Sequence, residues 1–183
     1  MLTIKLVLCR YTQVLLQLAS AHHCILLRLG LLKGDEEQLA AACGPGTSLH
    51  ALLAAPEVFV AGVGVTKDAQ LLADQYGLTV SGIIELAPVA QQKGAGLRTL
   101  CHTVLARELP KVHSIRCSDW LAQPLSDEQI KYAALDAEAG RQLLDALCSG
   151  GTESDPELLR QRCGRFSKSV LPRTSRDATV LVR

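Results

Sequence analysis

Residues 58–65, VFVAGVGV, form an unbroken run of valine, phenylalanine, alanine and glycine. A strand with one face in water alternates apolar and polar residues, so this run indicates a strand that is buried on both faces. Such a strand needs other elements packed on both sides of its sheet. The helical pattern TKDAQLLADQYG, residues 66–77, follows at once, with Thr66 predicted as its N-cap and Gly77 at its end. The run therefore predicts an α/β fold.

The remaining pattern adds a hairpin and four more helices. Two apolar runs, residues 12–20 and 24–30, flank the polar AHH and predict two antiparallel strands at the start of the chain. His22 and His23 in this turn could be metal ligands, but a solvated pair of loop residues is the favoured interpretation. Further helices are predicted at 34–43, 48–56, 96–109 and 126–150, with a strand at 80–86 and an irregular connector at 110–125.

The last predicted helix places a carboxylate beside the core. Ser126 with Gln129 three residues later is a capping-box pattern. The core stripe recurs in steps of three and four at positions 133, 137, 140, 144 and 147, while Asp127, Lys131, Glu138 and Asp145 occupy the solvated side. Tyr132 and Asp136 lie four residues apart along one edge of the stripe. A charge in that place needs a partner, a metal or a shell of hydrogen bonds.

Composition limits the classes of function. A chain of 183 residues suits one domain, and a net charge of +1 gives no overall reason to bind a polyanion. An aromatic content of 3% argues against a base-stacking platform, and no apolar run is long enough to span a bilayer. The seven cysteines include no CxxC pair, which favours reduced, buried thiols in an intracellular protein, in the nucleus or cytoplasm rather than an organelle.

The end of the chain has a different character. Residues 151–183 are polar and carry seven Lys and Arg against four Asp and Glu, without a helical or strand pattern. This composition predicts a basic, disordered C-terminal tail beyond a domain that occupies residues 1–150.

A phosphate-binding loop is a weaker alternative for GVGVTKD, residues 62–68. The stretch has neither a GxGxxG nor a GK[ST] pattern, so little supports a nucleotide site of the Rossmann type. Asp68 falls in the first turn of the predicted helix, where a carboxylate is favoured by the helix dipole alone.

The segment SIRCSDWLAQPLSDEQIKYAALDAEAG, residues 114–140, closely resembles the third motif of the DEDD 3′–5′ exonucleases in their tyrosine-containing branch. This branch includes the exonuclease domain of the Werner-syndrome helicase and, more distantly, RNase D. The resemblance continues upstream through GLRTLCHTVLARELPK and VFVAGVGVTKDAQLLADQYGL and covers residues 12–148. It implies an RNase H-like mixed β-sheet flanked by helices.

The resemblance also implies a chemistry. Family members remove nucleotides from the 3′ end of nucleic acid by hydrolysis at two divalent ions, Mg²⁺ or Mn²⁺, which four acidic residues hold. Asp68 matches the aspartate of the second motif and Asp136 that of the third, so both are implied metal ligands. Tyr132 matches the tyrosine that orients the attacking water. The implied catalytic residues are therefore Asp68, Tyr132 and Asp136, and the implied partner is a DNA or RNA 3′ end.

The first family motif, an Asp-x-Glu on the first strand, has no match. No Asp or Glu precedes Asp35, and MLTIKLVLC occupies the place of that strand without a carboxylate. We therefore expect an atypical or incomplete first strand and a compromised metal site. Three hypotheses follow: an alternative or mispredicted start of an active exonuclease, an inactive nuclease-fold module that binds nucleic acid or a protein partner, or a sheet whose first strand is lost.

Overall fold

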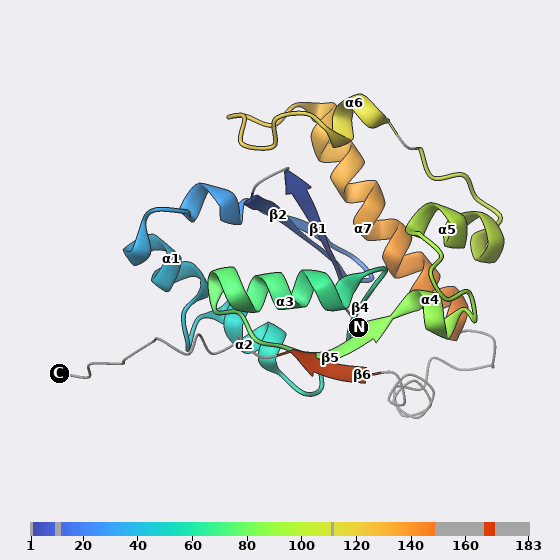
Figure 1. Ribbon diagram of the computed structural model, residues 1–183, viewed down its shortest axis with the longest axis horizontal. Helices are drawn as coiled ribbons and strands as arrows, with labels where there is room; N and C mark the ends of the chain where they lie inside the picture. The colour runs from blue at the N-terminus through green and yellow to red at the C-terminus, as the bar shows by residue number, and fades with distance from the viewer. Residues whose placement is uncertain (1, 10–11, 111, 149–166, 171–183) are drawn as a thin grey trace.

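The computed structural model describes residues 2–9, 12–110, 112–148 and 167–170 (Figure 1). Their strands form one sheet of six, in the order β3-β2-β1-β4-β5-β6. Strand β1 is antiparallel to β2 and parallel to β4, and β5 is parallel to β4 and antiparallel to β6. The predicted mixed sheet is thus confirmed. The strands are β1 (Leu2–Cys9), β2 (Thr12–Ala19), β3 (Cys24–Leu27), β4 (Val60–Gly62), β5 (Val80–Glu85) and β6 (Ser167–Val170).

Helices cover both faces of this sheet, as the buried run at 58–65 predicted. Val60 packs with Val65, Ala69 and Leu72 on the face covered by α3. The next residue of β4, Ala61, packs with Leu143 and Leu144 on the face covered by α7. The helices are α1 (Glu36–Cys43), α2 (Ser48–Ala54), α3 (Val65–Tyr76), α4 (Leu86–Val89), α5 (Leu97–Leu105), α6 (His113–Arg116) and α7 (Asp127–Cys148), with a 3₁₀ turn, η1 (Leu29–Leu32).

The predicted hairpin forms from β2 and β3, with Leu16 opposite Leu27 and Ala19 opposite Cys24. Ser20 Oγ accepts hydrogen bonds from the backbone N–H groups of His22 and His23, which closes the turn. Both histidines are exposed. Their exposure in this turn agrees with the loop interpretation of the pair.

Several predicted boundaries were wrong. The strand expected at 58–65 spans only Val60–Gly62, because Gly64 adopts a left-handed conformation with φ of 75° and α3 begins at Val65. The helix expected to 109 ends at Leu105, since Ala106 has φ of 51° and stops it. The connector contains the short helix α6. The exact ends of helices and strands depend on packing between distant segments, which a local sequence pattern does not specify.

The first strand does form, so the hypothesis of a lost strand is wrong. Strand β1 is eight residues long and lies between β2 and β4, in the middle of the sheet. Its register sets Lys5 opposite Gln17 and Leu2 opposite Val60. Its sequence, LTIKLVLC, contains no acidic residue.

Part of the predicted tail is ordered as a strand. Ser167–Val170 form β6, which pairs with β5 and so joins the sheet from beyond residue 150. No sequence pattern indicates this strand, because a four-residue edge strand with two serines and a lysine is held by backbone hydrogen bonds. The rest of 151–183 lies outside the described residues, and disorder there stays a prediction. Among the described helices, none has the length and hydropathy needed to cross a membrane.

Candidate functional site

Helix α7 positions two of the three predicted site residues. Its first turn carries the predicted capping box: Gln129 N donates to Ser126 Oγ at 3.2 Å, and Ser126 N donates to Gln129 Oε1 at 2.9 Å. The Gln129 amide also donates to Ser118 Oγ and to the Asp119 carbonyl, which attaches the preceding connector to the helix. The helix start is therefore fixed from both sides. Tyr132 and Asp136 follow one and two turns later.

Asp136 is the only carboxylate that is buried among the described residues, with a relative exposure of 6%. Ala133 and Ala137, on the same helix, are fully buried against the sheet. The predicted position of Asp136 beside the core is confirmed. Burial of a carboxylate has to be compensated by hydrogen bonds or opposite charge, so this residue has an environment that a surface aspartate lacks.

Tyr132 lies next to Asp136 in an apolar cluster with Leu15, Ile115 and Trp120. The rings of Trp120 and Tyr132 are 6.3 Å apart, measured between centroids, and inclined by 52°. Burial raises the pKa of the Tyr132 phenol, and the negative charge of Asp136 raises it further. Arg116 acts in the opposite direction. The two side chains predicted to act together are thus electrostatically coupled.

The coupling predicts a change in titration. In the Asp136→Asn variant the Tyr132 phenol should ionise at lower pH than in the wild type, because the carboxylate that disfavours phenolate is gone. The phenolate absorbance would be followed against pH, with Tyr132→Phe identifying the band. An unchanged Tyr132 titration in Asp136→Asn would show that the two groups do not interact.

The same coupling fixes the sign of a pH effect on stability. The folded-state pKa of Tyr132 lies above that of the unfolded chain, which is about 10. The contribution of Tyr132 to the free energy of unfolding is therefore complete below pH ~10. It is lost as the pH rises through the folded-state pKa of the phenol.

Asp68, the third predicted residue, lies half-buried in the first turn of α3. The N-cap of this helix is Gly64, not the predicted Thr66, and glycine has no side chain with which to cap it. Glu85 at the end of β5 caps the helix instead. Its carboxylate accepts hydrogen bonds from Gly64 N at 2.9 Å and from Thr66 N at 2.8 Å. These N–H groups would be the phosphate ligands of a phosphate loop, so the alternative is not supported.

Glu85 should therefore stabilise the turn that carries Asp68. Glu85→Ala removes a carboxylate that binds two helix N–H groups, and we expect a loss of about 1–2 kcal/mol in the free energy of unfolding. Urea denaturation would measure it. Glu57→Ala, at an exposed glutamate, is the control and should change stability by less than about 0.5 kcal/mol. Equal losses in the two variants would show that the cap contributes nothing.

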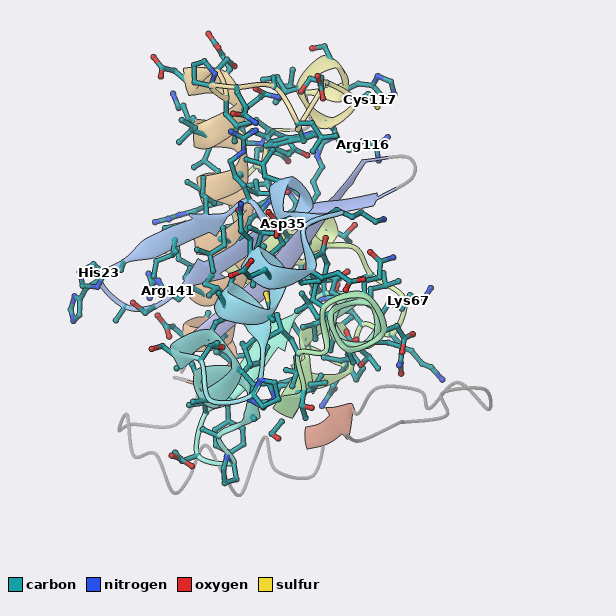
Figure 2. The ribbon with its side chains drawn as sticks, turned by 90° about the vertical axis from the view of Figure 1, so that its left-hand side faces the viewer. His23, Asp35, Lys67, Arg116, Cys117 and Arg141 are labelled. Atoms are coloured by element: carbon teal, nitrogen blue, oxygen red, sulfur yellow. The ribbon has the colours of Figure 1, made fainter. Side chains whose placement is uncertain are left out.

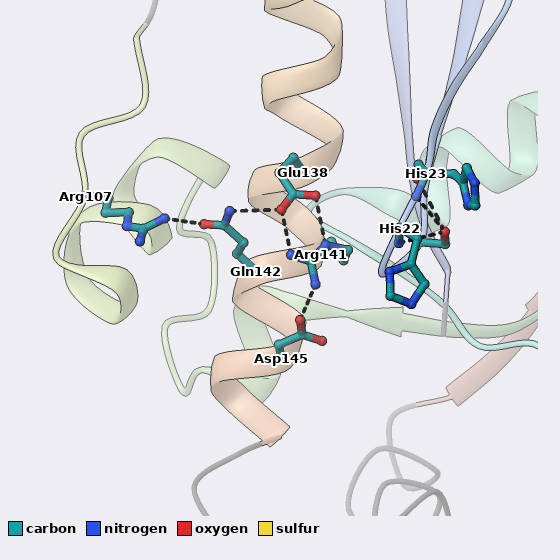
Figure 3. A network of polar contacts seen from close by, with 8 residues as sticks. His22, His23, Arg107, Glu138, Arg141, Gln142 and Asp145 are labelled. Carbon is teal, nitrogen blue, oxygen red and sulfur yellow. Dashed lines mark hydrogen bonds and ion pairs between the residues drawn. The ribbon is translucent and has the colours of Figure 1, made fainter. Parts of the chain in front are cut away.

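The outer side of α7 carries an ion-pair network instead of the purely solvated charges that the pattern predicted (Figure 3). Arg141 binds Glu138 at 2.6 Å and also pairs with Asp145. The Gln142 side-chain amide donates to Glu138 and accepts a hydrogen bond from Arg107, with 2.8 Å between Arg107 Nη1 and Gln142 Oε1. Arg107 follows the end of α5, so this contact links α7 to the segment after α5. The Arg141 bond lowers the pKa of Glu138. The two ion pairs join residues one turn apart on α7, and exposed pairs of this kind stabilise a helix by about 0.3–0.5 kcal/mol each.

Sequence reasoning missed one buried polar residue near the site. Gln17 on β2 has an exposure of 0%, and neither polar atom of its side chain has a hydrogen-bond partner among the described residues. It points to the same side of the sheet as Leu15, which packs with Ala133 of α7. Only the polar position within the apolar run 14–18 could have indicated it.

The side chains present do not fit the two-metal site that the resemblance implies. Mg²⁺ and Mn²⁺ are bound by several oxygen ligands each. Strand β1 has no acid to offer, and the described residues contain no group of three His, Cys, Asp or Glu that could hold an ion. Asp68 and Asp136 remain as two carboxylates from two helices.

Comparisons with known proteins agree with the fold. A model of a 3′–5′ exonuclease family matches residues 15–149. The human exonuclease 3′-5′ domain-containing protein 2 is 36% identical over 135 residues, which are 68% of this chain and 20% of the relative. The mouse bifunctional 3′-5′ exonuclease/ATP-dependent helicase WRN is 37% identical over 97 residues, 50% of this chain and 7% of the relative. The chain thus spans about a fifth or less of these two relatives.

The chain is also similar to solved structures. Trypanosoma brucei RNase D in complex with RNA U12 has a TM-score of 0.67 at 17% identity, over 98% of this chain and 67% of the other, which supports the RNase H-like fold. An EXD2 exonuclease domain soaked in Mn and Mg is 30% identical over 88% of this chain and 81% of the other, with a TM-score of 0.40. From the family model over residues 15–149 and the 36% identity to the human relative over 68% of this chain, the chain belongs to the 3′–5′ exonuclease family.

Proposed function

We propose that this chain is a nucleic-acid-binding member of the 3′–5′ exonuclease family that does not hydrolyse the phosphodiester bond. The observation that carries this proposal is strand β1, which occupies the middle of the sheet beside α7 with the sequence LTIKLVLC. The fold is complete at the place where the family has its first acidic motif, and the carboxylates are missing.

The chemical consequence is large. Asp68 and Asp136 correspond to two of the family's metal ligands and Tyr132 to the residue that orients water, but a two-metal reaction needs more oxygen ligands than two aspartates supply. A loss of ~4 kcal/mol in transition-state stabilisation is already about a thousandfold in rate. Hydrolysis should therefore fall below detection while the surface around Tyr132 is retained.

That surface suits a nucleotide. A pocket of about 240 Å³ opens between α7 and the connector before it. Its walls are mostly apolar, formed by Leu109, Pro110, Val112, Ile115 and Leu135, and its polar lining residues are Tyr132, Lys131, Glu128 and Asp136. Lys131 and Arg116 are exposed. Apolar walls accept a base, and Lys131 is the cation of the lining that can meet a phosphate, beside the carboxylates of Glu128 and Asp136; these features support binding of single-stranded nucleic acid.

The test separates cleavage from binding. Single-stranded and recessed-end DNA and RNA, labelled at the 5′ end, would be incubated with Mg²⁺ or Mn²⁺ and the wild type or Asp136→Ala. We expect no stepwise shortening by either protein. Shortening by the wild type that disappears in Asp136→Ala would show that the chain cleaves, and would overturn the proposal.

Binding would be measured with the same oligonucleotides by fluorescence anisotropy at two salt concentrations. Lys131→Glu should weaken it by about tenfold, because it reverses a charge at the pocket. Lys33→Glu makes the same charge change at an exposed lysine that follows η1 and does not line the pocket, and should have an effect below about twofold. Equal effects of the two changes would mean that the pocket does not bind nucleic acid.

A further inference from the structure

Two cysteine side chains are exposed in the part of the chain whose burial the structure describes. Cys24 follows the β2–β3 turn, and Cys117 directly follows α6. Cys43 and Cys101 are buried, and Cys148 is half-buried. Thiols react as thiolates, so exposure and neighbouring groups together decide which of them reacts.

Cys117 has a base beside it. Its Sγ lies 3.7 Å from Nε2 of His113, within the range of a hydrogen bond to sulfur. The pair is held by the backbone, because Cys117 N donates to the His113 carbonyl at 3.0 Å and so sets both side chains on one face of a helical turn. Arg116 is adjacent in the sequence and exposed, and Figure 2 shows Arg116 and Cys117 together at the α6 end of the molecule. A thiol next to an imidazole is the arrangement that activates sulfur nucleophiles.

Cys24 has the opposite surroundings. Partial burial raises the pKa of its thiol, and the negative charge of Glu138 raises it further. Both effects disfavour the thiolate. Among the cysteines whose burial the structure describes, two are thus exposed with contrasting neighbours, and the comparison between them isolates the contribution of those neighbours.

We propose that Cys117 is a site of covalent modification by thiol–disulfide exchange, activated by His113. The Cys117 sulfur attacks one sulfur of a low-molecular-weight disulfide, such as oxidised glutathione, while Nε2 of His113 takes the thiol proton. A new bond forms between Sγ and the attacked sulfur, and the original disulfide bond breaks. The second half of the disulfide leaves as a thiolate and receives the proton from the imidazole. The cysteine is oxidised to a mixed disulfide, and one half of the reagent is reduced to a thiol.

Cys117 lies close to the pocket beside Tyr132. Ile115, two residues before Cys117, packs in the cluster that contains Trp120 and Tyr132 and also lines the pocket beside Tyr132. A negative charge on the Cys117 sulfur raises the pKa of the Tyr132 phenol. An adduct on this sulfur is therefore attached at the edge of the candidate site. The reactivity itself does not depend on whether the pocket binds nucleic acid.

Kinetics on the full folded chain test the proposal. The protein would be exposed to oxidised glutathione, quenched at intervals with an isotope-coded alkylating reagent, and each cysteine followed by peptide mass spectrometry. We expect Cys117 to react at least about tenfold faster than Cys24 at neutral pH. In concentrated urea the two rates should become equal within about twofold, since the difference depends on folded neighbours. A native Cys117 that reacts no faster than Cys24 overturns the proposal.

A pair of histidine variants supplies the matched control. His113→Gln keeps a polar side chain but removes the base, and should slow Cys117 by about tenfold without changing Cys24. His23→Gln replaces the exposed histidine that precedes Cys24, and should leave the Cys117 rate unchanged. If His113→Gln leaves the Cys117 rate unchanged, the imidazole does not activate this thiol and the proposal is wrong.

Discussion

Trp120→Ala should lower the free energy of unfolding by about 3–5 kcal/mol, because a fully buried indole leaves a cavity that its neighbours fill only in part. Trp120 has an exposure of 0% and packs with Leu15 of β2 and Ala133 of α7. Its Nε1 donates to the Arg116 carbonyl at 3.3 Å, which ties the end of α6 to the same cluster. The residue thus joins the sheet, α7 and the connector at one point.

Urea denaturation of Trp120→Ala would be compared with that of Leu121→Ala. Leu121 is the next residue, but 43% of it is exposed, so its truncation should change stability by less than about 1 kcal/mol. Trp120→Phe keeps an aromatic ring and should lose about 1–2 kcal/mol, from the smaller ring and the missing donor. A loss below about 1 kcal/mol in Trp120→Ala would show that the connector is not packed as described.

The same residue packs in one cluster with Tyr132, so its loss should change the surroundings of the candidate site. Without the indole, water gains access to the phenol, and the part of the raised Tyr132 pKa that comes from burial should decrease. A titration of the Trp120→Ala variant at a temperature where it remains folded would separate this effect from unfolding.

The features that sequence predicted well are those whose physical cause lies within a few residues. The capping box of Ser126 and Gln129 is a local hydrogen-bond pattern and is present as predicted. The burial of Asp136 follows from helical periodicity, and the burial of β4 (Val60–Gly62) on two faces follows from the lack of polar residues in its run. In each case the residues that form the sequence pattern are also the residues that make the structural feature.

The features that sequence did not predict depend on contacts between distant segments. Glu85 caps α3 across 19 to 21 residues, and Arg28 donates to the carbonyls of Leu121 and Ala122 across 93 and 94 residues. No local pattern contains such a pair. The strand β6 is missed for the same reason, because its order comes from the free edge of β5.

Strand β1 shows that the sheet of this fold can form without an acidic residue on its first strand. Pairing with β2 and β4 uses backbone groups, which every residue carries, so LTIKLVLC completes the sheet without a carboxylate. Catalysis needs particular side chains at particular positions, and backbone pairing does not select them. Family membership therefore predicted the architecture correctly, whereas the reaction has to be argued from the residues present.

Gly82→Ala should lower the free energy of unfolding by about 3 kcal/mol or more, through two separate effects. The residue has φ of +63°, a left-handed conformation that costs an L-residue about 1–2 kcal/mol. A Cβ atom there would also lie 2.6 Å from the Val58 carbonyl oxygen, which is closer than real Cβ contacts. That oxygen belongs to the backbone, so it has no flexible side chain that could move away.

Gly77→Ala separates the two effects. Gly77, the C-cap of α3, has a nearly identical φ of +65°, but a Cβ there would meet no atom within 4 Å. Its substitution should therefore cost only the conformational part, about 1–2 kcal/mol, and the difference between the two variants measures the clash with Val58. Equal losses would mean that the segment at Val58 moves to accept a methyl group. The close packing of β5 against that segment would then be easily deformed. Glu85 lies three residues after Gly82 and binds the N-terminus of the helix that carries Asp68. Its position would be less firmly fixed than its hydrogen bonds to Gly64 and Thr66 indicate.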